Sequence, residues 1–197
     1  LAGENMVGLS RNAIVHKGIG RAFQVAKLFK SLTVEESLRA ALQSALGRAA
    51  QMHGNFPLMA TRDRAHEVMA QLGLQHKADT VSGNLSHGDQ KLLDMALALV
   101  LRPKVLLIDE PSIGLSPLVV QDVFKLLQRL AAQGTTVLMV EQNVKSALKY
   151  SHDAIALESG RLVLHKPASE MLADPQMERL FLGGVQAVAA PSNLGAT

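Results

Sequence analysis

The 197-residue chain contains no cysteine and no tryptophan, and only 3% of its residues are aromatic. The absence of cysteine excludes a disulfide framework and any cysteine-based zinc or redox site. Proteins that bind single-stranded nucleic acid stack bases on aromatic side chains, which are scarce here. We therefore expect no nucleic acid among the partners of this chain.

The sequence also lacks a long apolar run and a signal peptide. Its most apolar stretch, residues 95–108, is interrupted by Arg102, Pro103 and Lys104, whereas a membrane-spanning helix needs about 20 apolar residues. The seven histidines show no metal-ligand spacing. These absences predict a soluble chain without a histidine-bound metal.

Hydrophobic residues make up 48% of the chain, enough for a substantial core in one domain, with or without a subdomain. After an irregular start, Thr33 and Glu36 form a capping box that opens a helix over residues 35–46. Thr61 is the expected N-cap of a second amphipathic helix, which Gly73 ends. Residues 32–78 are thus predicted to be mainly helical.

From residue 88 onward the pattern alternates between helices and strands. We expect a helix over residues 89–101, a strand over 105–108, a helix from Pro117 with Ser116 as N-cap to Gly134, and a strand over 135–140. Asn143 is expected to cap a short helix, and residues 154–158 and 161–165 to form a hairpin. Alternating helices and strands predict an α/β fold with a parallel sheet.

Two adjacent carboxylates, Asp109 and Glu110, follow the apolar strand. Ligands of open α/β sheets bind beyond the carboxyl ends of the strands. An aspartate that holds a metal ion beside a glutamate that orients water suits phosphoryl chemistry. A strand that merely ends in a solvated acidic turn is the alternative.

The segment LSHGDQ places Ser86 and Gly88 just before an apolar helix, where backbone N–H groups and the helix dipole favour an anion. An ordinary helix start with Ser86 as its cap is the alternative. Residues 3–10 have the glycine spacing of a phosphate-binding loop, but Leu9 stands at the lysine position. We interpret residues 3–10 as an irregular surface segment.

Taken together, these motifs resemble those of the ATP-binding subunits of ABC transporters, most closely the importers of branched-chain amino acids, urea and amides. The resemblance covers residues 14–184 and rests on five segments in the family's order: GIGRAFQ, LSHGDQ, VLLIDEP, SIGLSP and VEQN. They are similar to the glutamine loop, signature, Walker B strand, D-loop and switch segment. The implied fold is α/β, a P-loop NTPase-like parallel sheet core with a helical subdomain, whose N-terminal strands are missing.

The resemblance also implies roles for individual residues. Asp109 and Gln24 would hold Mg²⁺, and Glu110 would orient the attacking water or accept its proton. Gln142, at the switch position, is the second residue implied as catalytic. ATP held by the opposite subunit would bind to the signature segment, and the residues implied for nucleotide binding are Gln24, Ser86, His87, Gly88, Asp89 and Gln90. Such a composite site requires a dimer.

Four parts are implied for the chain: a glutamine-loop segment (1–31), a helical subdomain (32–84), the remaining ATPase core (85–184) and a flexible tail (185–197). The implied partners are a second ATPase subunit, identical or different, and transmembrane permease subunits that contact the helical subdomain. The implied location is the cytoplasmic face of the cell membrane, as a peripheral protein.

The sequence departs from the family pattern at several places. The Walker A loop is absent, so we expect a fragment that binds ATP weakly or not at all. Gln142 replaces the switch histidine, and its amide still offers a hydrogen bond to the γ-phosphate. His87 replaces a signature glycine, and its Cβ restricts the backbone φ and ψ angles that are available close to the phosphate.

The leading expectation is an ATP-hydrolysing subunit of an importer for branched-chain amino acids or similar small polar solutes, truncated before Walker A and inactive alone. One alternative is a non-transport ABC ATPase that acts on DNA or ribosomes. Another is a structural or regulatory fragment that pairs with a complete subunit and lends it the signature segment.

Overall fold

The computed structural model describes residues 1–22, 28–45 and 58–174, which fall into two compact units. The first unit is Leu1–Gln142 and the second is Asn143–Thr197. Gln24 and the tail predicted at 185–197 lie outside the described residues.

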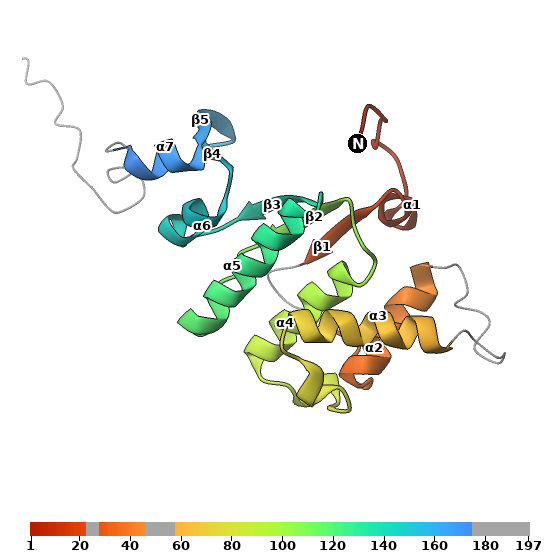
Figure 1. The fold of residues 1–197 in the computed structure, drawn as a ribbon. Helices are drawn as coiled ribbons and strands as arrows, with labels where there is room; N and C mark the ends of the chain where they lie inside the picture. The colour runs from red at the N-terminus through yellow and green to blue at the C-terminus, as the bar shows by residue number, and fades with distance from the viewer. Residues whose placement is uncertain (23–27, 46–57, 175–197) are drawn as a thin grey trace, which may run out of the picture. The chain divides into compact units, whose positions relative to one another are not determined.

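The first unit is built on a three-stranded parallel sheet, and the strand that ends in Asp109 lies in its centre (Figure 1). Its strands are β1 (Ile19–Ala22), β2 (Val105–Asp109) and β3 (Thr136–Val140), in the order β1-β2-β3. The register pairs Ile19 with Val105 and Asp109 with Val140. The predicted α/β fold with a parallel sheet is confirmed.

The start of the chain is more regular than predicted. It contains α1 (Arg11–His16) and β1, where the sequence indicated irregular structure. β1 is only four residues long, and Gly20 and Arg21 interrupt its apolar pattern. A Cβ on Gly20 would lie 3.1 Å from the carbonyl oxygen of Ala98, so close packing and pairing with β2 explain this strand.

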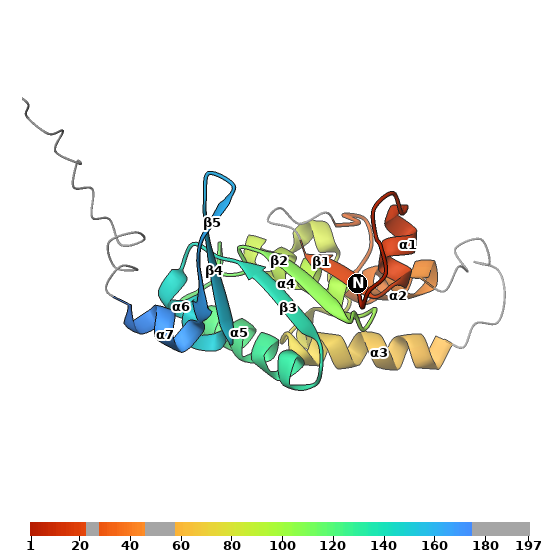
Figure 2. The same cartoon turned by 90° about the horizontal axis from the view of Figure 1, so that it is seen from above.

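Two helices flank the sheet: α4 (His87–Leu99) packs along β1, and α5 (Pro117–Ala132) packs along β3. Figure 2 shows their arrangement from above. α5 begins with Ser116 as N-cap and Pro117 in its first turn, as predicted. Along β3 the side chains alternate, and Leu138 and Val140 are 56% and 62% exposed.

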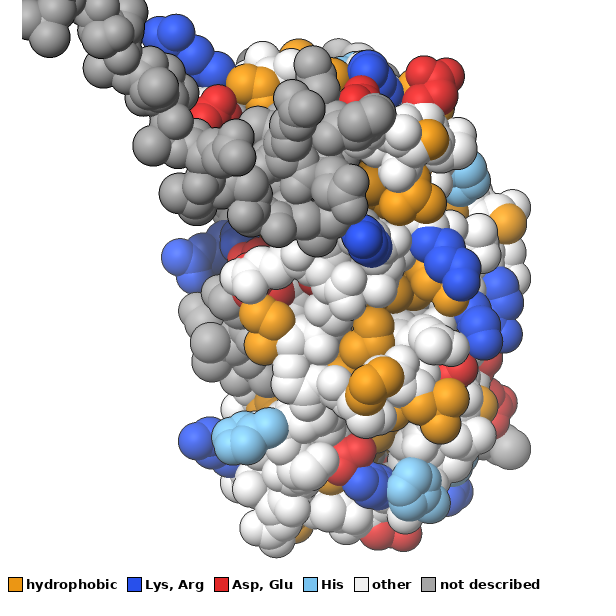
Figure 3. Space-filling model, turned by 90° about the vertical axis from the view of Figure 1, so that its left-hand side faces the viewer, with side chains coloured by type: hydrophobic (Ala, Val, Ile, Leu, Met, Phe, Trp, Pro, Cys, Tyr) orange, Lys and Arg blue, Asp and Glu red, His pale blue; other side chains and the backbone are white. Residues whose placement is uncertain are grey.

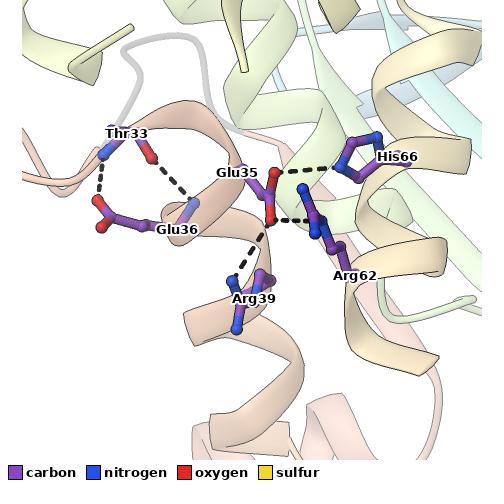
Figure 4. A network of polar contacts seen from close by, with 6 residues as sticks. All are labelled: Thr33, Glu35, Glu36, Arg39, Arg62 and His66. Carbon is purple, nitrogen blue, oxygen red and sulfur yellow. Dashed lines mark hydrogen bonds and ion pairs between the residues drawn. The ribbon is translucent and has the colours of Figure 1, made fainter. Parts of the chain in front are cut away.

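The helical section contains α2 (Val34–Ala45), α3 (Leu58–Gln71) and the short 3₁₀ helices η1 (Gln75–Lys77) and η2 (Ser82–Asn84). The predicted capping box is present at the start of α2 (Figure 4). The Thr33 N–H donates to Glu36 Oε2 at 2.8 Å, and the Glu36 N–H donates to Thr33 Oγ1 at 3.2 Å.

A polar network joins α2 to α3 (Figure 4). Glu35, only 13% exposed, lies 3.4 Å from Arg39 Nη1 and 3.4 Å from Arg62 Nε. Its other oxygen is 3.1 Å from His66 Nε2. Glu35 is therefore the residue on which the cross-helix contacts converge.

The predicted start of α3 was wrong. The helix begins at Leu58, so Thr61 lies inside it, 6% exposed, instead of capping it. Gly73 follows the helix end with a φ of +71°, in agreement with its predicted role. Arg64 of α3 donates to the carbonyl oxygens of Leu99 and Val100, at 2.7 and 3.2 Å. These bonds give hydrogen-bond partners to carbonyl groups at the C-terminus of α4.

The second unit contains α6 (Val144–Tyr150), β4 (Asp153–Glu158), β5 (Arg161–Pro167) and α7 (Ala168–Ala173). Asn143 caps α6 by accepting from the Ser146 N–H at 3.3 Å. β4 and β5 form the predicted antiparallel hairpin. Its turn has φ values of +50° at Ser159 and +76° at Gly160, as two-residue hairpins require.

In the described part of the chain, no helix has the length and apolar character needed to cross a bilayer. On the side drawn in Figure 3, hydrophobic side chains reach the surface in small groups separated by polar and charged ones.

Candidate functional site

The sheet brings the ends of β2 and β3 to the same level. Asp109 is the last residue of β2 and pairs with Val140, the last residue of β3. The Glu110 N–H donates to the Val140 carbonyl oxygen at 2.8 Å. The segments that follow the two strands therefore start side by side.

Glu110 has an unusual backbone and a defined side-chain partner. Its φ is +48°, in the left-handed region that non-glycine residues rarely adopt. Gln142 Nε2 donates to Glu110 Oε1 at 2.8 Å. The structure thus brings together the two residues that the sequence predicted as catalytic.

Glu141 makes a third contact between the two strand ends, which the sequence did not predict. Its Oε1 accepts from the Ser112 N–H at 2.6 Å. Ser112 belongs to the D-loop segment that follows Glu110 and Pro111. The VEQN segment that contains Glu141 was identified from the sequence. The partner of Glu141 becomes visible only when β2 and β3 pair in the sheet.

Lys91 of α4 was also missed. Its side chain is only 5% exposed, and its Nζ donates to the Asp109 carbonyl oxygen at 3.3 Å. Burial lowers the pKa of Lys91, and the nearby carboxylates of Asp94, Asp109, Glu110 and Glu141 oppose that shift. A lysine on the buried side of the apolar helix was the signal that the sequence offered.

The signature turn is held by its own side chains. Ser86 is the N-cap of α4, and its Oγ accepts from the Asp89 N–H at 3.2 Å while donating to the Asp89 carboxylate. Lys77 pairs with the same carboxylate. Burial raises the pKa of Asp89, but hydrogen bonds from Lys77 and Ser86 outweigh it, so that pKa lies below its usual value.

The remaining signature residues line the same turn. Gln90 Nε2 donates to the Leu85 carbonyl oxygen at 3.1 Å, so its amide folds back onto the turn. Ser86 and His87 are exposed. A Cβ on Gly88 would lie 3.4 Å from Leu115 Cδ2 and 3.5 Å from the Gly114 carbonyl oxygen, so the D-loop lies against the signature turn of the same chain.

The donor set suits a magnesium ion held jointly with phosphate. Within the described ranges, no group of three or more His, Cys, Asp or Glu residues has the arrangement of a metal cage. Mg²⁺ in phosphoryl-transfer sites is bound by one or two carboxylates plus phosphate oxygens and water. The carboxylate of Asp109 at the end of β2 fits that requirement.

This arrangement corresponds to the P-loop NTPase-like class of ATPase cassettes. Among solved structures, the chain is similar to the ADP conformation of MJ1267, an ATP-binding cassette of an ABC transporter, with a TM-score of 0.72 and 25% identity. The match covers 91% of this chain and 74% of MJ1267. The family model described as "ABC transporter" matches residues 2–113, and the chain belongs to that family.

Two curated relatives indicate the kind of system. The chain is 35% identical over 182 residues to the high-affinity branched-chain amino acid transport ATP-binding protein BraG of Pseudomonas aeruginosa, covering 92% of this chain and 74% of BraG. It is 31% identical over 175 residues to the lipopolysaccharide export system ATP-binding protein LptB of Escherichia coli K12, covering 89% of this chain and 69% of LptB. The chain is thus an ATP-binding subunit of the transporter family, and neither relative supports the alternative of DNA or ribosome action.

Proposed function

We propose that this chain is the ATP-binding subunit of an importer for branched-chain amino acids or similar small polar solutes such as urea and amides. Its similarity to BraG supports the solute class. The observation that carries the hydrolytic role is the hydrogen bond from Gln142 to Glu110 at the end of the central strand. It holds a carboxylate where an open sheet binds its ligand.

In the proposed reaction, water attacks the γ-phosphorus of ATP while the bond from that phosphorus to the bridging oxygen of ADP breaks. The Glu110 carboxylate orients the water and takes its proton, which then leaves to phosphate or solvent. Gln142 keeps Glu110 in place and offers its amide to the γ-phosphate. Asp109, together with Gln24, would hold Mg²⁺, which neutralises charge on the phosphate oxygens.

The signature residues would bind ATP held by a second ATPase subunit. Ser86 lies five residues before Lys91, which contacts Asp109. At 1.5 Å per residue, the helix separates the Ser86 turn from the level of Lys91 by roughly 7.5 Å. The exposure of Ser86 and His87 leaves this turn open to a phosphate group presented by another molecule. Asp89 and Gln90 would shape that turn through their contacts with Ser86 and Leu85.

We further propose the four-part division of the chain given by its motifs: 1–31, 32–84, 85–184 and 185–197. The helical subdomain would contact transmembrane permease subunits on the cytoplasmic face of the membrane. Its α2–α3 network around Glu35 provides a stiff pair of helices for such a contact.

Lipopolysaccharide export is the second candidate, because LptB is 31% identical to this chain. The two candidates share the ATPase chemistry and differ in what the permease subunits move and in the direction of transport.

Hydrolysis is tested in a phosphate-loop chimaera, which is this chain preceded by the strand and GxxxxGK[ST] loop of a complete family member. Glu110→Gln is expected to lower turnover about a hundredfold or more, because the amide accepts no proton. ATP binding, measured by calorimetry, should remain. Turnover equal to that of the unmodified chimaera would remove Glu110 from the mechanism.

Import is tested by deleting the gene in the source organism and measuring uptake of radiolabelled leucine, isoleucine, valine, urea and acetamide. Uptake of at least one solute should fall and should return with the intact gene. Unchanged uptake of all five, accompanied by loss of surface lipopolysaccharide, would assign the chain to the export system instead.

A further inference from the structure

Lys91 is a buried cation with no place in the proposed reaction so far. It is 5% exposed in α4, a position that lysine rarely takes. A buried ammonium is costly unless it is paired and hydrogen-bonded. The groups that face Lys91 therefore indicate why it is there.

The carboxylates around Lys91 come from two places. Asp94, 6% exposed, lies three residues further along the same helix. Asp109, Glu110 and Glu141 belong to the ends of β2 and β3, and all of them favour the charged form of Lys91. Like charges so close together repel one another, and the ammonium lowers that repulsion.

One direct contact of Lys91 is more specific than this general attraction. Its Nζ donates to the Asp109 carbonyl oxygen, at 3.3 Å, in the peptide that joins Asp109 to Glu110. The N–H of the same peptide donates to the Val140 carbonyl oxygen at 2.8 Å. Both polar atoms of this peptide are thus fixed, immediately before the residue with a φ of +48°.

We propose that Lys91 is a positioning residue for hydrolysis, which fixes the Asp109–Glu110 peptide and so aims the Glu110 carboxylate. Ser86 is the N-cap of the helix that contains Lys91. Through this helix, Lys91 also connects the Ser86 turn, which would bind the nucleotide of the partner subunit, to Glu110, which would act on the nucleotide of its own subunit. This inference rests on the proposed function for its catalytic meaning. The positioning itself is a property of this chain and is measured without nucleotide.

The first experiment measures amide hydrogen exchange by NMR in the 197-residue chain. In Lys91→Met, exchange at the Glu110 and Ser112 amides should be about tenfold faster or more, because the peptide loses its carbonyl anchor. Exchange at Leu106 and Ile108, in the middle of β2, should not change. Lys91→Arg keeps the charge and a donor and should retain most of the protection, and Lys125→Met, at an exposed position of α5, is the matched control.

A purely structural role for Lys91 predicts a different pattern. Equal acceleration at all amides of β2 would show that Lys91 only supports the core, and unchanged exchange at Glu110 would overturn the proposal directly. If Lys91→Met does not fold, Lys91→Gln serves instead, since its amide is a neutral donor. An acceleration at Glu110 of about threefold or more is expected there, and no acceleration would again contradict the proposal.

The second experiment measures kinetics in the phosphate-loop chimaera. Lys91→Met should lower kcat about tenfold or more while KM for MgATP stays within about twofold, and Lys91→Arg should recover most of the kcat. If Glu110→Gln abolishes turnover but Lys91→Met does not lower it, the inference on Lys91 is wrong and the proposed function stands. If Glu110→Gln leaves turnover intact, the proposed role of Glu110 in hydrolysis fails, and amide exchange still decides whether Lys91 positions the peptide.

Discussion

At the scale of the residue, Asp89 illustrates how a candidate phosphate site can be occupied by its own side chains. Its carboxylate accepts the Ser86 hydroxyl hydrogen and pairs with Lys77 at the start of α4. An acidic group there interacts favourably with the helix dipole, as an incoming phosphate also would. Phosphate binding at this turn therefore requires the Ser86 hydroxyl to exchange its partner.

The charge of Asp89 should make a contribution to stability that depends on pH. Because the folded state lowers the pKa of Asp89 from 3.8, the contribution is complete above that value and is lost as pH falls through the lower folded pKa. Compared with Asp89→Asn, the wild-type chain should be about 1 kcal/mol more stable at pH 6, with the difference shrinking below pH 4. Urea denaturation from pH 6 to pH 3 measures it.

The double-mutant cycle with Lys77→Met identifies the partner of Asp89. In the Lys77→Met background, Asp89→Asn should have a smaller effect at pH 6, because much of the interaction is already gone. A difference between wild type and Asp89→Asn that is the same at every pH would contradict the assignment.

The residues of the site divide by the range of the signals that specify them. Ser86 was predictable, as were the caps outside the site at Asn143 and Thr33–Glu36, since a cap is recognised within a few residues of sequence. Lys91 and Glu141 were not, because their partners lie on other elements and are reached only when the sheet forms. The positions of Asp109 and Glu110 followed from the apolar strand before them.

At the scale of the element, α2 and α3 depend on one carboxylate. Glu35 accepts contacts from its own helix through Arg39 and from α3 through Arg62 and His66 (Figure 4). It is 13% exposed, whereas Arg62 is 63% exposed. An exposed cationic side chain loses little free energy when its partner is removed, whereas a mostly buried carboxylate depends on its basic partners.

Glu35→Gln should therefore lower the free energy of unfolding by about 1–2 kcal/mol. The amide keeps the shape of the side chain but not the charge that faces three basic groups. Urea titration followed by circular dichroism at the helix band measures the loss. The matched change Arg62→Gln should lower stability by less than about 0.5 kcal/mol, and equal effects of the two variants would refute the central role of Glu35.

Elements with strong local signals were predicted well. The run before Asp109 became β2, and the Ser159–Gly160 turn joins the predicted hairpin. α1 and β1 were missed because six- and four-residue elements carry little periodicity. β1 is formed by contacts with β2 and α4, and α1 packs against β1 and α2. α3 began earlier than predicted because Thr61, a good cap, also fits inside a helix.

At the scale of the whole molecule, the proposed function gives one copy two different surfaces for nucleotide. The ends of β2 and β3 carry the acidic residues, and the exposed Ser86 turn starts α4, whose Lys91 contacts Asp109. A dimer in which each copy completes the other's site would use both surfaces at once.

This assembly predicts nucleotide-dependent dimers. In the phosphate-loop chimaera, Glu110→Gln with MgATP should sediment as a dimer in analytical ultracentrifugation, because the bound ATP is not consumed. Adding Ser86→Arg should return it to a monomer, since the larger side chain fills the turn that receives the phosphate. The exposed α5 change Gln128→Arg is the control, and a dimer that survives Ser86→Arg would exclude the signature turn from the interface.

The left-handed backbone of Glu110 has a consequence for anyone who engineers this protein. A non-glycine residue in that region is strained by about 1–2 kcal/mol, which a glycine would relieve. A search for strained positions to stabilise would therefore select residue 110. Replacing Glu110 with glycine would yield a more stable protein that has lost its proposed general base. At Glu110, the strained residue that follows β2, stability and activity are therefore opposed.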